Sequence, residues 1–166
     1  AAGRNGCIAD LKLDSIGLKT GRRETISVNE HYQTNIPNIF AVGDVIGFPA
    51  LASTGMDQGR VAVTHMFNLF DSEHIHPVLP FGIYTIPEVS MVGMTSEEAA
   101  QQNETYVSGT AKCPECVRGQ LLGNTYGQLK IIAQKESGVI TGVHMIGPLA
   151  TEVIHYGMSL VCQKTS

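Results

Sequence analysis

Short apolar runs alternate with turn residues over the first fifty positions of the chain. Two of these runs, 25–28 and 39–42, have the length and the β-branched or aromatic content of strands. The second run is apolar at every position, as expected of a strand that is buried on both faces. Gly43 and Asp44 follow it directly. The pattern therefore predicts that both residues lie at the carboxyl end of a buried strand.

A helix from Leu51 to Phe70 gives the strongest periodic signal in the chain. Its predicted buried face consists of apolar and small residues at spacings of three and four, namely Leu51, Gly55, Met56, Gly59, Ala62, Val63, Met66, Phe67 and Phe70. Glycine lowers helix stability, so Gly55 and Gly59 predict that a backbone or a ligand approaches this face closely.

A polar, proline-bounded segment at 71–80 follows the helix and predicts a domain boundary. The pattern is different on its far side. Residues 81–92 are strand-like, and Thr95 with Glu98 forms a capping box that opens a short helix. The second half of the chain is therefore expected to form a separate domain with a different secondary structure from the first.

Two strands and a helix are predicted for the remaining residues. The runs 127–133 and 139–146 are joined by a turn into a hairpin. Pro148 then stands in the first turn of a final helix, whose pattern continues through Lys164. These elements predict an antiparallel sheet with helices packed on it. The sequence opens without methionine and both ends fall within predicted elements, so we expect a fragment of a longer protein.

Composition and charge argue against several classes of function. Of the 166 residues, 43% are hydrophobic and 16% are charged, which is typical of a globular chain. The formal net charge of -4 argues against a nucleic-acid partner. No apolar run is long enough to span a membrane, and no signal-peptide pattern is present. We therefore expect a soluble cytoplasmic protein.

Four cysteines are too few and too unevenly spaced for a secreted disulfide framework. Cys113 and Cys116 have the spacing of a redox pair or of half a zinc site, but no second pair of ligands stands at zinc spacing. We interpret them as structural and predict no metal site. His74 and His76 are interpreted as part of a solvated linker.

Gly43, Asp44 and the start of the helix at 50–53 form the most informative combination. Open α/β sheets bind ligands at the carboxyl ends of their strands. Glycine lets the backbone approach a flat cofactor, and aspartate accepts a hydrogen bond from a sugar-type hydroxyl. The free N–H groups and positive dipole end of a helix favour a group that becomes anionic, such as a reduced flavin. A glycine–aspartate dipeptide alone would indicate no more than a turn.

Longer motifs resemble the family of dihydrolipoamide dehydrogenase and glutathione reductase, which are dimeric FAD-dependent pyridine-nucleotide oxidoreductases. The first 72 residues resemble the closing part of the FAD domain, through Ala2-Gly3-Arg4-Asn5, Gly17-Leu18, Gln33-Thr34 and the run from Pro37 to Val45. Residues 80–162 resemble the interface domain, through the runs Thr85 to Gly93 and Gly142 to Gly147.

The resemblance implies a division of the chain into four segments. These are the tail of the NAD(P)-binding domain (1–12), the closing part of the FAD-binding domain (13–72), a linker (73–80) and a dimerisation domain truncated at its C-terminus (81–166). The implied fold is α/β plus α+β, a remnant of a discontinuous FAD-binding domain followed by an antiparallel-sheet interface domain. The implied partner is a second copy, bound through 81–166.

Cofactor-binding residues are implied in the same way: Gly3, Gly43, Asp44, Ala50, Leu51, Ala52 and Ser53. Asp44 matches the aspartate that bonds the ribityl chain of the flavin, and 50–53 match the backbone that faces the isoalloxazine. Gly3 matches the glycine that closes on the nicotinamide dinucleotide. The implied cofactors are FAD and NAD(P), and no catalytic residue is implied within this chain.

Within the family, the motifs at 45–53 and 82–88 are most similar to soluble pyridine nucleotide transhydrogenases. This similarity implies hydride transfer from NADPH through flavin to NAD+, with pyridine nucleotides as substrates. A dihydrolipoamide dehydrogenase-type activity is the alternative. The sequence lacks the family's Gly-rich dinucleotide-binding motifs and its C-terminal His-Pro segment. We therefore expect this chain alone to be inactive, and a role in dimerisation only is a third possibility.

Overall fold

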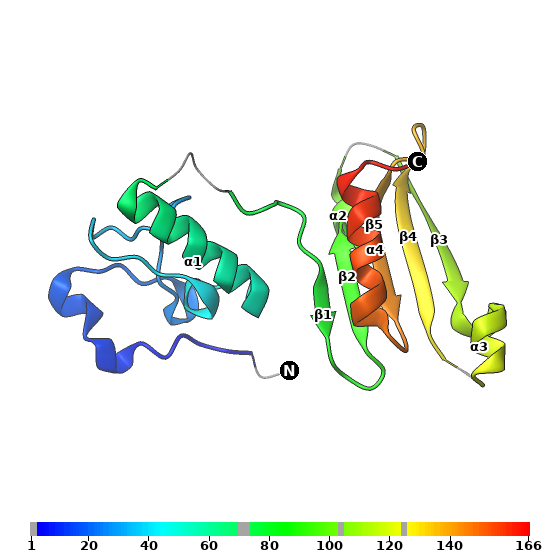
Figure 1. The fold of residues 1–166 in the computed structure, drawn as a ribbon, viewed down its shortest axis with the longest axis horizontal. Coiled ribbons are helices and arrows are strands. Elements are labelled where there is room, and N and C mark those ends of the chain that lie inside the picture. Colours follow the sequence, from blue (N-terminus) through cyan, green and yellow to red (C-terminus); the bar gives the residue numbers. More distant parts are fainter. Residues whose placement is uncertain (1–2, 70–73, 103–104, 124–125) are drawn as a thin grey trace. The chain divides into compact units, whose positions relative to one another are not determined.

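The computed structural model describes residues 3–69, 74–102, 105–123 and 126–166. The chain forms two compact units, Ala1–Ile75 and His76–Ser166 (Figure 1). Each unit has a hydrophobic core of its own. Among the described residues, no helix combines the length and the apolar character that crossing a membrane would require.

The first unit consists of short helical turns and one long helix. Four 3-10 turns span Ala9–Leu11 (η1), Leu13–Ile16 (η2), Arg22–Glu24 (η3) and Gly43–Ile46 (η4), and helix α1 spans Ala52–Phe67. Its core is formed by apolar side chains of the turns and loops, namely Ile8, Leu18, Ile26 and Ala41.

The strands predicted at 25–28 and 39–42 are wrong as regular strands. In the described part of the first unit, these runs pair only through the isolated bridges Thr20↔Ile26 and Gln33↔Phe40. A strand is stabilised by a ladder of hydrogen bonds to a neighbour. Single bridges supply too few of these bonds to make a ladder, so the runs are extended loops.

The helix predicted from Leu51 to Phe70 is present as α1. It begins one residue later than predicted because Leu51 is extended (φ -123°, ψ 133°) and acts as the N-cap. Its last turn closes at Asn68, which is left-handed (φ 49°) and donates its N–H to the carbonyl oxygens of His65 and Thr64. Phe70 lies outside the described residues.

The buried face predicted for α1 is largely wrong. The fully buried positions are Thr54, Gln58, Val61, Ala62 and Thr64, of which the prediction contained only Ala62. The predicted positions Met56, Val63, Met66 and Phe67 are exposed. Periodicity counts apolar residues and therefore misses a face on which polar side chains are buried with hydrogen-bond partners.

The second unit is a five-stranded antiparallel sheet in the order β1-β2-β5-β4-β3. The strands are β1 (Phe81–Ile83), β2 (Val89–Gly93), β3 (Tyr106–Lys112), β4 (Gln128–Gln134) and β5 (Ile140–Ile146). The remaining elements are α2 (Ser96–Gln101), η5 (Cys113–Glu115), α3 (Val117–Leu121) and α4 (Ala150–Cys162). Helix α4 lies across β2 and β5, as Figure 1 shows.

The predicted hairpin and capping box are confirmed. Strands β4 and β5 pair antiparallel, and the side chain of Thr95 accepts from the N–H of Glu98 while the Glu98 carboxylate accepts from the N–H of Thr95. The single strand predicted at 81–92 is instead two strands, β1 and β2, which pair with each other. The Ile86–Pro87 bond in the loop between them is cis, and a proline there cannot donate to a ladder.

Helix α4 begins at Ala150, so the prediction that Pro148 lies in its first turn is wrong. Leu149, in a left-handed conformation (φ 58°), is the N-cap. The helix ends at Cys162, and the N–H of Thr165 donates to the carbonyl oxygen of Leu160. The predicted continuation of the helical pattern through Lys164 is therefore also wrong.

Candidate cofactor-binding site

The turn η4 is fixed to α1 through the backbone of Gly43. Gly43 is left-handed (φ 76°), and its N–H donates to Oε1 of Gln58 at 2.6 Å. A Cβ on Gly55 would lie 3.3 Å from Cα of Gly43. The close backbone approach predicted at Gly55 is thus present, whereas nothing lies within 4 Å of a Cβ placed on Gly59. Asp44 follows Gly43 and is held at a defined place beside α1.

Asp44 opens onto a cleft of about 520 Å³ in the first unit. The cleft is lined by Arg4, Asn5, Gly6, Cys7, Arg23, Thr25, Asp44, Val45, Gly47, Phe48 and Ala50. Of the predicted cofactor-binding residues, the structure brings Asp44 and Ala50 to this cleft. Gly3, Gly43, Leu51, Ala52 and Ser53 are not among its lining residues.

The Asp44 carboxylate has a cationic neighbour. Nη1 of Arg4 lies 3.2 Å from Oδ2 of Asp44, and the two side chains are 88% and 54% exposed. An ion pair this exposed contributes little free energy of its own. The carboxylate oxygens of Asp44 therefore remain available to accept hydrogen bonds from a bound hydroxyl group.

The N-terminus of α1 supplies donors close along the chain to the cleft residue Ala50. The N–H of Gly55 donates to the carbonyl oxygen of Leu51, which is an intrahelical bond of the first turn. The N–H groups of Ala52 and Ser53 precede that donor and have no acceptor within the helix. Both residues are exposed, so this positive dipole end faces solvent or a ligand.

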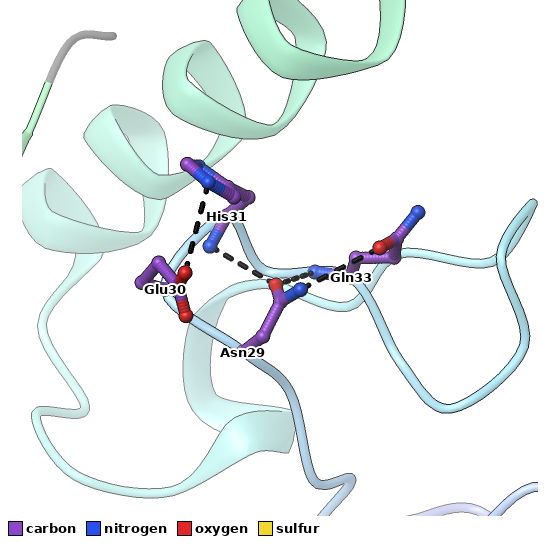
Figure 2. A network of polar contacts seen from close by, with 4 residues as sticks. All are labelled: Asn29, Glu30, His31 and Gln33. Atoms are coloured by element: carbon purple, nitrogen blue, oxygen red, sulfur yellow. Dashed lines mark hydrogen bonds and ion pairs between the residues drawn. The ribbon is translucent and has the colours of Figure 1, made fainter.

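A polar network supports the loop that precedes η4 (Figure 2). Oδ1 of Asn29 accepts from the N–H groups of His31 and Gln33, each at 3.0 Å. The ring of His31 stacks on that of His65 in α1, with centroids 4.1 Å apart and planes 4° apart. Loop and helix are thereby joined at a second point, besides the bond from Gly43 to Gln58.

Sequence reasoning missed three residues that shape this site. Arg4 stood within a quoted motif, but nothing in the pattern indicated that it pairs with Asp44. Arg23 lines the cleft, and the sequence pattern did not single it out. Gln58 was not among the residues predicted to be buried, and it is 2% exposed. Its position three residues after Gly55 was the available signal, because residues three apart share a helix face.

Cysteine and histidine side chains were the other candidates for chemistry. All four cysteines are free. Nδ1 of His76 contacts the backbone of Val78 and lies 3.9 Å from Sγ of Cys162. Within the described ranges, no three side chains of the metal-ligating types are grouped so that they could hold a metal ion.

Comparison with known proteins identifies the family. A family model described as "Pyridine nucleotide-disulphide oxidoreductase, dimerisation domain" matches residues 79–165, and one described as "Pyridine nucleotide-disulphide oxidoreductase" matches residues 1–59. The chain belongs to the pyridine nucleotide-disulphide oxidoreductase family. The resemblance inferred from the motifs is therefore confirmed.

Curated relatives extend this result over nearly the whole chain. The chain is 44% identical over 163 residues to the soluble pyridine nucleotide transhydrogenase of Colwellia psychrerythraea and 43% identical over 164 residues to that of Klebsiella pneumoniae. The alignments cover 98% and 99% of this chain but 35% of each relative. The chain thus spans about a third of the length of these relatives.

Solved structures show the same fold. LpdA from Mycobacterium tuberculosis matches 96% of the chain with a TM-score of 0.81 at 24% identity. The HOCl-induced flavoprotein disulfide reductase RclA from Escherichia coli matches 97% with a TM-score of 0.86 at 23% identity. The matches cover 35% and 37% of those chains. The predicted fold class, an FAD-domain remnant followed by an antiparallel-sheet dimerisation domain, is confirmed.

Proposed function

We propose that this chain is part of an FAD-dependent oxidoreductase that transfers hydride from NADPH through flavin to NAD+. The observation that carries the proposal is the identity of 42–44% to soluble pyridine nucleotide transhydrogenases across 98–99% of the chain. The cleft at Asp44 supports it, because its acceptor and the donor end of α1 are the two features that a flavin would use. We propose that the protein is located in the cytoplasm.

The residues of the cleft fit a flavin in their chemistry. Asp44 would accept a hydrogen bond from a ribityl hydroxyl, and its half-exposed carboxylate is accessible for that contact. Ala50 and the N–H groups of Ala52 and Ser53 would face the ring system, where the helix dipole favours negative charge. Gly3 would contact the nicotinamide dinucleotide. Bound FAD would supply the chemistry, accepting a hydride from one nucleotide and passing it to the other.

The second unit is proposed to assemble two copies into a homodimer. Ile83, Val89 and Ile146 are all exposed, and they are neighbours in the register of β1, β2 and β5. Tyr84 and Ile86, in the loop after β1, are 82% and 98% exposed. Exposed apolar groups that are contiguous in this way mark interaction surfaces.

The dimer proposal predicts the effect of a charge on this surface. Ile83→Glu is expected to weaken the dimer at least about tenfold, because it would desolvate an unpaired carboxylate. Sedimentation equilibrium measures this change. Leu11→Glu is the matched control, since Leu11 is 59% and Ile83 is 58% exposed and Leu11 lies in the first unit. The proposal would be contradicted if both substitutions weakened the dimer equally, or if neither of them weakened it.

Dihydrolipoamide dehydrogenase-type chemistry is the alternative activity. The test uses the full-length, FAD-loaded protein that carries this chain. NADPH-dependent reduction of an NAD+ analogue is measured beside NAD+-dependent oxidation of dihydrolipoamide. We expect the first reaction and not the second. Dithiol oxidation without transhydrogenation would overturn the proposal in favour of the alternative, and loss of both would favour a role in dimerisation only.

A further inference from the structure

The Cys113-Pro114-Glu115-Cys116 segment has no part in the proposed function. It follows β3 as the 3-10 turn η5 and leads into α3, and both thiols are free. We propose that Cys113 and Cys116 form a redox-active dithiol, which closes to an intramolecular disulfide by exchange with small-molecule disulfides. The segment would then be a thiol-modification site on the dimerisation domain, and this inference is independent of the flavin chemistry.

The turn brings the two cysteines within bridging distance. The N–H of Cys116 donates to the carbonyl oxygen of Cys113 at 3.2 Å, which closes a turn of four residues. Residues three apart in a 3-10 turn eclipse each other, and a rise of ~2 Å per residue separates their Cα atoms by about 6 Å. Disulfides join Cα atoms that are about 4.4–6.8 Å apart. Closure therefore needs side-chain rotation and little movement of the backbone.

Cys116 is the more accessible of the two thiols. It is exposed at the N-cap of α3, where its Sγ accepts from the N–H of Gly119 at 3.3 Å. The same Sγ donates to the carbonyl oxygen of Cys113 at 3.1 Å, so the sulfur already lies over the turn that holds its partner. A reagent from solvent would meet Cys116 first.

Cys113 is half-buried and placed to act second. A Cβ placed on Gly127 would lie 2.6 Å from Sγ of Cys113. The sulfur therefore fills the space beside Gly127. The backbone around the pair is also tight, since a Cβ on Gly119 would lie 1.8 Å from the carbonyl oxygen of Cys113. Glycine at 119 and 127 thus leaves room for Cys113 in this turn, where its thiol is half-buried and less accessible than that of Cys116.

The exchange balances in two steps. The Cys116 thiolate attacks one sulfur of the small-molecule disulfide, which forms a mixed disulfide and releases one thiolate. The Cys113 thiol then gives its proton to solvent, attacks Sγ of Cys116 and displaces the second thiolate. The cysteine pair is oxidised by two electrons, and the reagent is reduced to two thiols. A soft metal is the weaker alternative, because no third ligand joins the pair among the residues that the structure describes.

The experiment uses the whole chain with Cys7→Ser and Cys162→Ser, so that the pair supplies the only thiols. The reduced protein is mixed with 4,4'-dithiodipyridine, and release of thiopyridone is followed beside intact mass. We expect two equivalents of thiopyridone and a protein that has lost two hydrogens. With Cys113→Ser added, a stable pyridyl adduct on Cys116 should form instead. Ring closure should be on the order of tenfold or more faster in the native protein than in urea, because the turn pre-positions the thiols.

Peptide mapping of the protein with all its natural cysteines supplies a second test, which does not depend on the serine variants folding. A Cys113–Cys116 bridge after treatment with oxidised glutathione is the expected result. Stable adducts on both cysteines would overturn the proposal, as would a bridge to Cys7 or Cys162. Equal closure rates in native and urea-denatured protein would overturn it too, since the folded turn would then contribute nothing.

Discussion

The hydrogen bond between Gly43 and the buried side chain of Gln58 fixes the backbone that leads to Asp44, the proposed flavin-binding residue. The Gly43 N–H donates to Oε1 of Gln58, which is 2% exposed. A buried donor without an acceptor is costly, so this bond fixes where the backbone leads into Asp44. The position of Asp44 in the cleft thus depends on a helix residue that never contacts the cleft.

Removal of this acceptor is expected to destabilise the protein. Gln58→Leu keeps the approximate volume but leaves the Gly43 N–H unpaired, which lowers the free energy of unfolding by about 1–3 kcal/mol. Urea denaturation measures the change. The control is Gln120→Leu, because Gln120 is exposed on α3. A loss at Gln58 no larger than at Gln120 would show that the bond does not matter.

Glu88, which directly precedes β2, and Ser90, within β2, make the contacts that determine where α4 begins. Oε2 of Glu88 accepts from the hydroxyl and the N–H of Thr151 at 2.7 and 3.0 Å, and the Ser90 hydroxyl donates to the carbonyl oxygen of Ala150. The side chain of Glu88 thus satisfies a free N–H group of the first helical turn. The sequence pattern predicted the helix but not this start, because the capping group lies 63 residues away.

The Glu88 cap predicts a pH dependence of stability. The Thr151 hydroxyl, and then its N–H, donate to the carboxylate and hold the pKa of Glu88 below its usual value of 4.5. Because the folded-state pKa is the lower one, the unfolded state binds the proton first. The stabilisation is therefore present above pH 4.5 and is lost as the pH falls through the folded-state pKa. Glu88→Gln should flatten this acid limb in thermal melts, whereas Glu136→Gln, in an exposed turn, should leave it unchanged. Identical limbs for the two variants would refute the role of the cap.

The glycines of the two long helices predict opposite responses to alanine. A Cβ on Gly157 in α4 would lie 3.0 Å from two atoms of Val143, and nothing lies within 4 Å of a Cβ on Gly59 in α1. Gly157→Ala should lower the free energy of unfolding by about 1–3 kcal/mol through overpacking. Gly59→Ala should raise it by up to about 1 kcal/mol through helix propensity. Denaturant unfolding compares them, and a shift of the same sign in both would contradict the packing of α4 on β5.

At the scale of the whole molecule, the two units differ in how far the sequence predicted them. The hairpin of β4 and β5 was predictable because its ladder forms between runs that are adjacent in the chain. The run 39–42 was predicted as a strand on its apolar character alone, and it lacks a ladder in the described part of its unit. The motif through Asp44 nevertheless indicated the family, because the resemblance does not depend on which secondary structure carries the motif. The contact of Arg4 with Asp44 could not be predicted, since it joins residues 40 positions apart. Gln58 was missed because the face of α1 was predicted from its apolar residues, although its spacing from Gly55 was a signal.

FAD binding by the full-length protein tests the central claim, that the cleft at Asp44 is the flavin site. Asp44→Ala removes the proposed acceptor, and Asp57→Ala is the control, because Asp57 is a half-exposed carboxylate on α1 paired with Arg60. Fluorescence titration of the apoprotein should show FAD affinity about tenfold to 100-fold lower for Asp44→Ala, as expected for a lost hydrogen bond to a charged group. The Asp57 variant should bind like the unmodified protein. Equal FAD affinity in the two variants would contradict the assignment of the flavin to this cleft.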